Sequence, residues 1–202
     1  MLNRYIIIDD FYNEPDQLVQ IALDSLSEKD SPTGNYAGLM TTESFFGDQH
    51  REILKQLTLE PSIDSSTNAN GRLRFTRAND TFKMHIHFDV ENTTRWAGVL
   101  YLSKNHPKVD GTCFWKHLKT GLEAAPNTPE GFAKHGWKDF RDFRTFLATE
   151  GLDESLWEKQ LVIPYKYNRL VLFRPWLLHS PGPSWGDTAE NSRIVQTLFL
   201  GN

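Results

Sequence analysis

The sequence predicts a mainly β fold with flanking helices, of the sandwich or barrel kind. Short apolar runs of strand length recur through the second half of the chain, and clusters of Gly, Pro, Asn and Asp separate most of them. In residues 82–90 apolar and polar side chains alternate, a period of two that is typical of a half-buried strand. The first part of the chain instead carries helical spacing, which places the flanking helices there.

Residues 1–71 are expected to form a strand and two helices. Residues 5–8 are apolar and predict a strand. Asn13 and Pro15 are typical of the cap and first turn of a helix. The apolar side chains expected on this helix are Leu18, Ile21, Ala22 and Leu26. A second helix is expected over residues 48–59, and the side chains expected on its apolar face are Ile53, Leu54 and Leu57.

Residues 72–202 are expected to hold the β core, after a polar loop at residues 62–71. Besides 82–90, strands are predicted at 73–77, 96–103, 111–115, 168–174 and 193–200. Residues 116–163 predict a helical insertion, with an apolar face formed by Trp137, Phe140, Phe143, Phe146 and Leu147. The 202 residues are expected to form a single domain, because the chain is only slightly longer than the roughly 150 residues of a typical domain.

The composition excludes several classes of protein. Lys and Arg number 22 against 26 Asp and Glu, so the net charge of −4 creates no field that attracts nucleic acid or an anionic membrane. Cys113 is the single cysteine, which excludes an internal disulfide and favours a reducing compartment. No apolar run approaches the roughly 20 residues of a membrane span, and the N-terminus lacks the pattern of a signal peptide. We expect a cytoplasmic protein; the sequence carries no indication of its oligomeric state.

Two imidazoles and one carboxylate occupy alternate positions in residues 85–89. In a strand, alternate side chains point the same way, so His85, His87 and Asp89 would share one face. Such a polar face usually points to solvent, and the pattern alone is weak. Two histidines and one carboxylate are, however, the ligand set of nonhaem Fe(II) oxygenases.

A third ligand would have to come from elsewhere, and His179 is the strongest candidate. It follows the apolar strand pattern of residues 169–173 and precedes a turn at residues 180–183, a position suited to the mouth of a pocket. Arg193 begins the last predicted strand and is its only charged residue. A guanidinium in such an apolar strand favours a carboxylate partner.

Four segments of the chain occur in the same order as in the Fe(II)- and 2-oxoglutarate-dependent oxygenases, and they resemble the prolyl-4-hydroxylase-like branch of that family. They also resemble a small group of uncharacterised bacterial oxygenase-like proteins. The matching segments are His87-Phe88-Asp89 for the first metal motif, 96–103 for the following strand, 110–114 for the Gly-Gly-x-Thr-x-Phe segment, and 168–173 with His179 and Arg193 for the closing half. The resemblance implies a double-stranded β-helix, the jelly-roll core shared with cupins. The sequence departs from the family at Asp110, Ser103 and Val195, and in a longer gap between His179 and Arg193.

The resemblance also implies the site and the reaction. His87, Asp89 and His179 would bind Fe(II), Arg193 would bind the distal carboxylate of 2-oxoglutarate, and Tyr101 would be a second donor to that carboxylate. The implied reaction uses dioxygen to hydroxylate a small molecule, an amino acid or a peptide, with decarboxylation of 2-oxoglutarate to succinate. Related halogenases lack the carboxylate ligand, so Asp89 favours hydroxylation.

Two other functions stay open. His85-x-His87-x-x-x-Glu91, with Gly98 beyond it, also resembles the first metal motif of cupins, which would make the chain a metalloenzyme that needs no 2-oxoglutarate. His85 would then be a ligand, whereas in the oxygenase it could hydrogen-bond to one. A non-catalytic β-barrel that binds a ligand is the third possibility. Residues that flank the strands and would either line a pocket or pack elsewhere are Arg74, Trp115, His117, Arg174 and Trp176.

Overall fold

The structure is a computed structural model of the 202-residue chain, and it describes residues 3–26, 37–60, 69–89 and 95–201. The elements in chain order are β1 (Tyr5–Ile8), α1 (Pro15–Ser25), β2 (Leu39–Met40), α2 (Asp48–Thr58), β3 (Leu73–Thr76), β4 (Trp96–Tyr101), β5 (Asp110–His117), α3 (Pro129–Ala133), α4 (Phe140–Glu150), the 3₁₀ helix η1 (Glu154–Leu156), β6 (Trp157–Pro164), β7 (Leu170–Phe173), β8 (His179–Pro181) and β9 (Arg193–Leu200). Within these residues no helix is long and apolar enough to cross a membrane.

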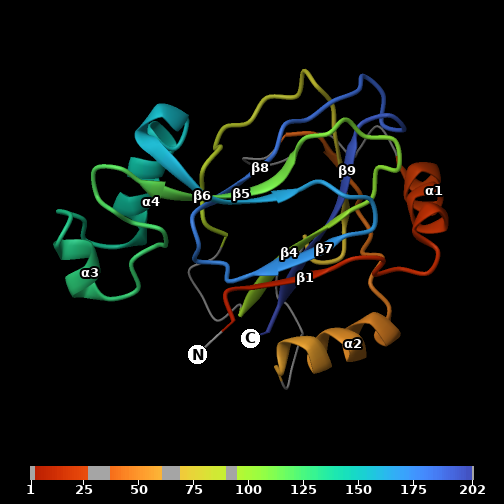
Figure 1. The fold of residues 1–202 in the computed structure, drawn as a ribbon, viewed down its shortest axis with the longest axis horizontal. Coiled ribbons are helices and arrows are strands. Elements are labelled where there is room, and N and C mark those ends of the chain that lie inside the picture. The colour runs from red at the N-terminus through yellow and green to blue at the C-terminus, as the bar shows by residue number, and fades with distance from the viewer. Residues whose placement is uncertain (1–2, 27–36, 61–68, 90–94, 202) are drawn as a thin grey trace.

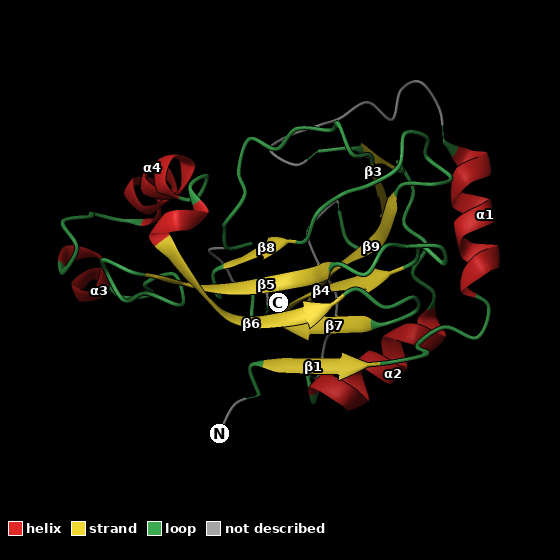
Figure 2. Cartoon of the chain, turned by 45° about the horizontal axis from the view of Figure 1, so that its top comes forward, coloured by secondary structure: helices red, strands yellow, loops and turns green. Residues whose placement is uncertain are grey.

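The strands form two antiparallel sheets packed face to face (Figures 1 and 2). The larger sheet has the order β1-β7-β4-β9-β3-β2, and the smaller has the order β6-β5-β8. From β3 onward the chain passes repeatedly between the sheets, and an isolated bridge between His87 and His179 extends the smaller sheet beyond β8. This strand order is that of a jelly roll, or double-stranded β-helix. The predicted fold class, mainly β with flanking helices, is therefore confirmed.

Helices α1 and α2 lie beside the larger sheet, and α3 and α4 lie beyond one end of the smaller sheet (Figure 1). Ala22 of α1 and Leu54 of α2 pack against Leu73 and Leu198 of the larger sheet. On the smaller sheet, α3 and α4 lie in the connection between β5 and β6. The side chains that join this connection to the smaller sheet include Trp115, Phe132, Phe143, Leu147 and Trp157.

A third apolar cluster fills part of the space between the sheets. In it, Phe114 of β5 packs with Val171 of β7 and Val195 of β9. Because side chains alternate along a strand, Leu198 of β9 faces the helices while Arg193 and Val195 face the smaller sheet. The alternation of β9 therefore delivers a buried charge to the inside of the jelly roll.

Residues 82–89 do not form the continuous strand that their alternation predicts. The backbone N–H groups of Ile86, His87 and Asp89 donate to Gly151, His179 and Pro175 respectively, which do not follow one another along a single strand. Without a single neighbouring strand no ladder develops, and only the bridge at His87 is left.

The two faces of this segment are nevertheless the predicted ones. Ile86 and Phe88 are buried against α4, and His87 and Asp89 line a pocket. Val90, which the prediction also included, lies outside the described residues, as do residues 62–68 of the predicted loop.

Strands β2, β6 and β8 were not predicted. In β6 only Trp157 and Ile163 are buried, so this edge strand carries no alternating pattern, and its residues were assigned to the helical insertion. In β8, which ends at Pro181, His179 was expected to precede a turn, and Ser180 and Pro181 were predicted to belong to that turn. Short or exposed strands give little signal in a sequence because few of their side chains are buried.

The two N-terminal helices occur where they were predicted, but they bury fewer side chains. Ile21 of α1 is 57% exposed, and Glu14 rather than Asn13 occupies the N-cap position. In α2, Leu54 is fully buried, whereas Ile53 and Leu57 are 37% and 38% exposed. Of the three side chains that the spacing places on one face of α2, only Leu54 is therefore fully buried, because the helix presents a narrow stripe to the sheet.

We predict that Leu54→Ala lowers the free energy of unfolding by about 2–5 kcal/mol, because it leaves a cavity in the cluster under α2. Leu57→Ala, on the same helix, is the matched control and should cost less than about 1 kcal/mol because its side chain is already exposed. Urea unfolding of the two variants measures the difference, and equal losses would contradict the described packing.

Candidate metal centre

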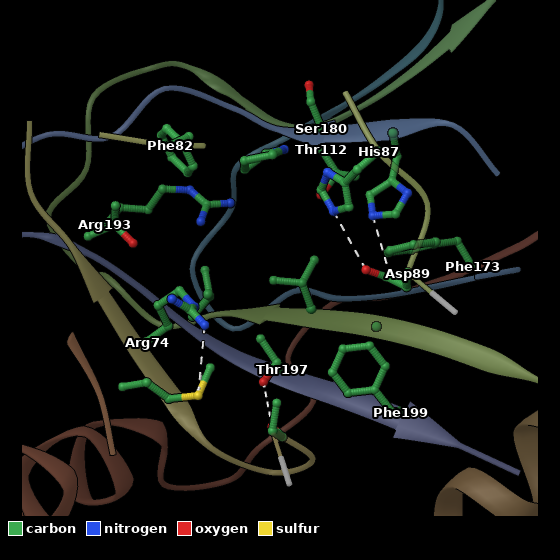
Figure 3. Close-up of a pocket in the computed structure, with 18 residues that line it drawn as sticks. Arg74, Phe82, His87, Asp89, Thr112, Phe173, Ser180, Arg193, Thr197 and Phe199 are labelled. Carbon is green, nitrogen blue, oxygen red and sulfur yellow. Dashed lines mark hydrogen bonds and ion pairs between the residues drawn. The ribbon is translucent and has the colours of Figure 1, made fainter. Parts of the chain in front are cut away.

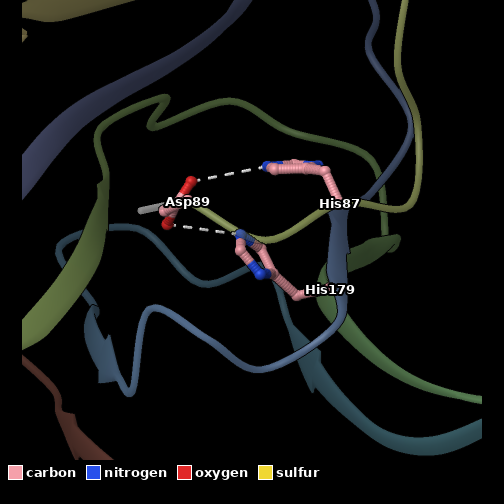
Figure 4. A group of neighbouring side chains, drawn as sticks. All are labelled: His87, Asp89 and His179. Atoms are coloured by element: carbon pink, nitrogen blue, oxygen red, sulfur yellow. Dashed lines mark ion pairs between the residues drawn. The ribbon is translucent and has the colours of Figure 1, made fainter. Parts of the chain in front are cut away.

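Three side chains from distant parts of the chain converge at one end of the smaller sheet (Figure 4). His87 and His179 form the isolated bridge, and Asp89 follows two residues later. Nε2 of His87 lies 3.5 Å from Oδ1 of Asp89, and Nε2 of His179 lies 3.5 Å from Oδ2. The candidate ligand atoms all lie within 4.8 Å of one another. This is close to the span of ligands around one ion, with bonds of about 2.1 Å.

Backbone carbonyls determine which nitrogen of each imidazole carries the proton. Nδ1 of His87 lies 2.8 Å from the carbonyl oxygen of His85, and Nδ1 of His179 lies 2.8 Å from that of Leu177. A carbonyl can only accept, so Nδ1 donates in both neutral rings and Nε2 keeps its lone pair. The centre then contains two imidazole lone pairs and a carboxylate facing one another. A cation satisfies all of these acceptors at once.

The surroundings of His179 and Asp89 favour the protonation states that a metal ion requires. His179 is 5% exposed, and burial lowers the pKa of its imidazole to about 4, although the Asp89 carboxylate opposes this shift. Burial alone would raise the pKa of Asp89, but His179, His87 and Arg144 together hold it below its usual value. Neutral imidazole and ionised carboxylate are the forms that bind divalent metals. The donor set fits Fe(II) and related transition ions.

The centre opens into a pocket of about 150 Å³ between the two sheets (Figure 3). Its walls are mainly apolar, and its charged residues among those described are Arg74, Asp89 and Arg193. The other lining residues are Met40, Ala69, Thr76, Phe82, His87, Gly98, Val99, Thr112, Phe173, His179, Ser180, Pro181, Val195, Thr197 and Phe199.

Arg193 is buried in this pocket wall with no acidic partner among the described residues. Its side chain is 4% exposed and donates from one terminal nitrogen to the carbonyl oxygen of Gly111, at 3.2 Å. The guanidinium carbon lies 6.0 Å and 5.9 Å from the ring centres of Tyr101 and Tyr165. Nε has no hydrogen-bond partner within the described part of the chain. A buried cation with an unused donor beside a pocket is suited to binding an anion.

Tyr101 lies behind the pocket wall and is not one of the lining residues. Its side chain is fully buried, and its hydroxyl is 2.7 Å from Oγ1 of Thr112, which does line the pocket. The Tyr101 ring stacks on Tyr165 with ring centres 4.5 Å apart. Thr112 was missed as a site residue, although it is the threonine of the Gly-Gly-x-Thr-x-Phe segment. The matching segment could therefore have identified the Thr112 hydroxyl as a polar group in the same pocket as Arg193.

His85 does not join the metal centre. Its Nε2 lies 2.8 Å from Oε1 of Glu154 in η1, while its backbone carbonyl accepts the hydrogen bond from His87. Among the described residues, the group that could hold a metal is His87, Asp89 and His179, and Glu91 of the cupin-like motif lies outside them.

Of the five residues that could have flanked a pocket, Arg74 lines it. The other four, Trp115, His117, Arg174 and Trp176, are not among the lining residues. Arg174, for example, places its guanidinium 3.8 Å from the ring centre of Trp96 and so takes part in packing.

Comparisons with known proteins give a family and a distant structural likeness. A family described as "Family of unknown function (DUF6445)" matches residues 2–192. No curated protein matches the sequence. Among solved structures, the chain is similar to a prolyl hydroxylase from Trichoplax adhaerens in complex with a hypoxia inducible factor oxygen degradation domain peptide fragment. The sequence identity is 12% and the TM-score 0.48, over 98% of this chain and 84% of that chain. The strand order described above, rather than this likeness, carries the assignment of the fold.

We predict that Co(II) stabilises the protein through this centre. At a Co(II) concentration about 100 times its dissociation constant, the free energy of unfolding should rise by about 2.7 kcal/mol, because the ion binds only the folded chain. Asp89→Ala should abolish this gain, and His85→Ala should retain it because the His85 side chain faces Glu154. Urea unfolding with and without Co(II) checks both, and loss of the gain in His85→Ala would favour the cupin-like ligand set.

Proposed function

We propose that this chain, which belongs to DUF6445, a family of unknown function, is an Fe(II)- and 2-oxoglutarate-dependent dioxygenase that hydroxylates its substrate. The proposal is drawn from the site. The observation that carries the proposal is a pairing within one pocket: a His-Asp-His group whose two imidazoles are buried, and a buried arginine without an acidic partner among the described residues. The first fits a ferrous ion and the second fits the far carboxylate of a dicarboxylic keto acid.

His87, Asp89 and His179 would hold the iron. When bound, the iron would supply the oxidative chemistry that couples hydroxylation of a C–H bond by dioxygen to the decarboxylation of 2-oxoglutarate to succinate. The chain's part is orientation. The carbonyl groups of His85 and Leu177 fix each imidazole with Nε2 toward Asp89.

Arg193 would bind the distal carboxylate of 2-oxoglutarate, with help from the hydroxyl of Thr112. Tyr101 donates to Thr112 or accepts from it, so in this proposal it acts on the carboxylate through Thr112 and not by direct contact. Tyr101 and Tyr165 also present their rings to the guanidinium, which steadies a cation that has left water. The residue often found as Ser two positions after the arginine is Val195 here, and Thr112 is a hydroxyl that could replace it.

The apolar walls of the pocket would exclude water from the reacting atoms. Val99, Phe173 and Phe199 line it on the side of the larger sheet, and Phe82 lines it from the segment that leads to His87. A dry site strengthens the charge interactions of Asp89 and Arg193 and limits side reactions with water.

Two observations favour this function over the alternatives. The metal-ligand candidates His87 and His179 are 4% and 5% exposed, which does not fit a solvated polar face on a plain binding module. The His85 side chain lies against Glu154, which removes one ligand from the cupin-like set.

We predict that anaerobic addition of Fe(II) and 2-oxoglutarate produces a visible metal-to-ligand charge-transfer band. Asp89→Ala should lose the band. Arg193→Met should raise the 2-oxoglutarate concentration for half-maximal absorbance by about tenfold or more, because a charge-assisted hydrogen bond is lost. Arg72→Met is the matched control, since Arg72 is absent from the lining residues.

A band that forms without 2-oxoglutarate would support the cupin-like enzyme. A wild-type protein that binds no Fe(II), with air oxidation of the iron excluded, would overturn the proposal in favour of a binding module.

We also predict that the protein forms succinate slowly from 2-oxoglutarate in the presence of Fe(II), dioxygen and ascorbate, even without its substrate, because ascorbate can reduce the second oxygen atom to water. The residues that hold the iron and the keto acid are built into the fold and do not depend on the substrate. Succinate measured by mass spectrometry should fall to background in His179→Ala and stay at the wild-type level in Arg72→Met. Equal succinate formation in His179→Ala and wild type would contradict the assignment of the ligands.

A further inference from the structure

A second pocket lies in the connection between β5 and β6, which the proposed function does not use (Figure 1). Its volume is about 480 Å³, and its lining residues are Lys119, Thr120, Lys134, His135, Trp137, Phe146 and Glu150. None of them lines the pocket of the metal centre. We propose that this second pocket is an ester-hydrolysing site in which the hydroxyl of Thr120 is the nucleophile.

Three side chains at this pocket form a chain of hydrogen bonds. Oγ1 of Thr120 lies 2.9 Å from Nδ1 of His117, and Nε2 of the same imidazole lies 2.8 Å from Oε2 of Glu150. His117 ends β5, Thr120 lies in the turn after it, and Glu150 ends α4. A hydroxyl within reach of an imidazole that a carboxylate orients is the arrangement that activates serine and threonine nucleophiles.

The contacts of His117 determine which of its nitrogens carries the proton. A carboxylate only accepts, so Nε2 donates to Glu150. The backbone N–H of Thr120 donates to Nδ1, at 3.3 Å, so Nδ1 is an acceptor. In the neutral ring Nδ1 therefore also accepts from the Thr120 hydroxyl. His117 is thus a general base that is already hydrogen-bonded to the proton it would remove.

Packing holds the imidazole in this orientation. His117 is 1% exposed, and its ring centre lies 5.0 Å from that of Phe146 and 4.6 Å from that of Trp157. The indole N–H of Trp157 donates to the backbone carbonyl of Glu150, at 2.8 Å, which joins the end of α4 to the start of β6. The base is therefore fixed beneath the pocket, while Thr120 and Glu150 reach its surface.

The other walls of the second pocket indicate the substrate class. Neither Lys119 nor Lys134 has an ion pair within the described part of the chain, so both ammonium groups can stabilise the negative charge that develops on an attacked carbonyl oxygen. Trp137 and Phe146 give the pocket aromatic walls. These walls suit a small ester that carries an aromatic group.

The proposed reaction is a two-step hydrolysis. Oγ1 of Thr120 attacks the ester carbonyl and gives its proton to Nδ1 of His117, and the bond to the alcohol breaks as the alcohol takes that proton. Water then attacks the acyl-threonine and gives a proton to Nδ1, and Oγ1 of Thr120 leaves the acid and takes this proton back. Nothing is oxidised or reduced, so the reaction needs neither iron nor dioxygen.

The test labels the full chain with a fluorophosphonate probe, which reacts with activated hydroxyl groups. Peptide mass spectrometry should locate the probe at Thr120, at the same rate with and without EDTA. Glu150→Gln should be labelled about tenfold or more slowly, because its neutral amide no longer stabilises the imidazolium. Thr145→Val is the matched control on α4, since this exposed hydroxyl donates to the carbonyl of Arg141, and it should leave the labelling rate unchanged.

Multiple turnover of p-nitrophenyl acetate should fall about tenfold or more in Thr120→Val and stay at the wild-type level in Thr145→Val. Urea unfolding of each variant checks that it is folded.

The wild-type protein alone can overturn the inference, if the probe does not react at Thr120 or reacts there only without EDTA. Equal labelling of folded Glu150→Gln and wild type would also overturn it. None of these outcomes affects the proposed function, whose charge-transfer band is measured separately.

Discussion

Two backbone hydrogen bonds between His87 and His179 hold the candidate site together. Each residue donates its N–H to the carbonyl of the other, at 2.9 Å in both directions. The pair joins two segments that lie far apart in the chain, and it places the imidazole ring centres 4.4 Å apart. Asp89 is then brought to both rings by the next backbone bond, from its N–H to the carbonyl of Pro175. The donor set is thus positioned by main chain and does not depend on contacts among the three side chains.

The jelly roll separates the structural and chemical parts of the molecule by face. On β9, the side chains of Ile194, Leu198 and Leu200 complete the cluster under the N-terminal helices. The alternate residues of the same strand, beginning with Arg193, line the pocket. Burial of apolar side chains on the outer face stabilises the folded chain. This stabilisation offsets the free-energy cost of burying the Arg193 cation and the acceptor groups of the metal centre on the inner face. The charged groups of the pocket are therefore supported by a core to which they do not contribute.

Much of the fold could be predicted from the sequence because strands buried on one or both faces have a clear pattern. Strand β9 was predicted with its observed bounds, and β3, β4 and β7 within a few residues. The convergence of His87, Asp89 and His179 was expected from the family resemblance, which rests on the order of the motifs. The periodicity of the sequence does not indicate which distant strands become neighbours. Strand β6 was missed because its exposed residues carry no alternation. The strand predicted at 82–90 is not continuous in residues 82–89, because the backbone bonds of residues 86, 87 and 89 do not run along a single neighbouring strand. The assignment of the whole chain to one domain stays a prediction.

Gly111 links the two walls of the anion site and limits how the sequence can diverge. Its carbonyl accepts from Arg193, and a Cβ added at this position would lie 2.6 Å from the hydroxyl of Tyr101. The added Cβ would also lie 2.8 Å from the carbonyl oxygen of Ile163, so a larger residue at 111 is tolerated only if the ring at 101 becomes smaller and the backbone of β6 shifts. A shift of the 111 backbone would instead move the carbonyl that holds Arg193. Among related sequences these two positions should covary, with Tyr at 101 found only where 111 is Gly. Family members with other residues at both 101 and 111 would therefore have a different anion pocket.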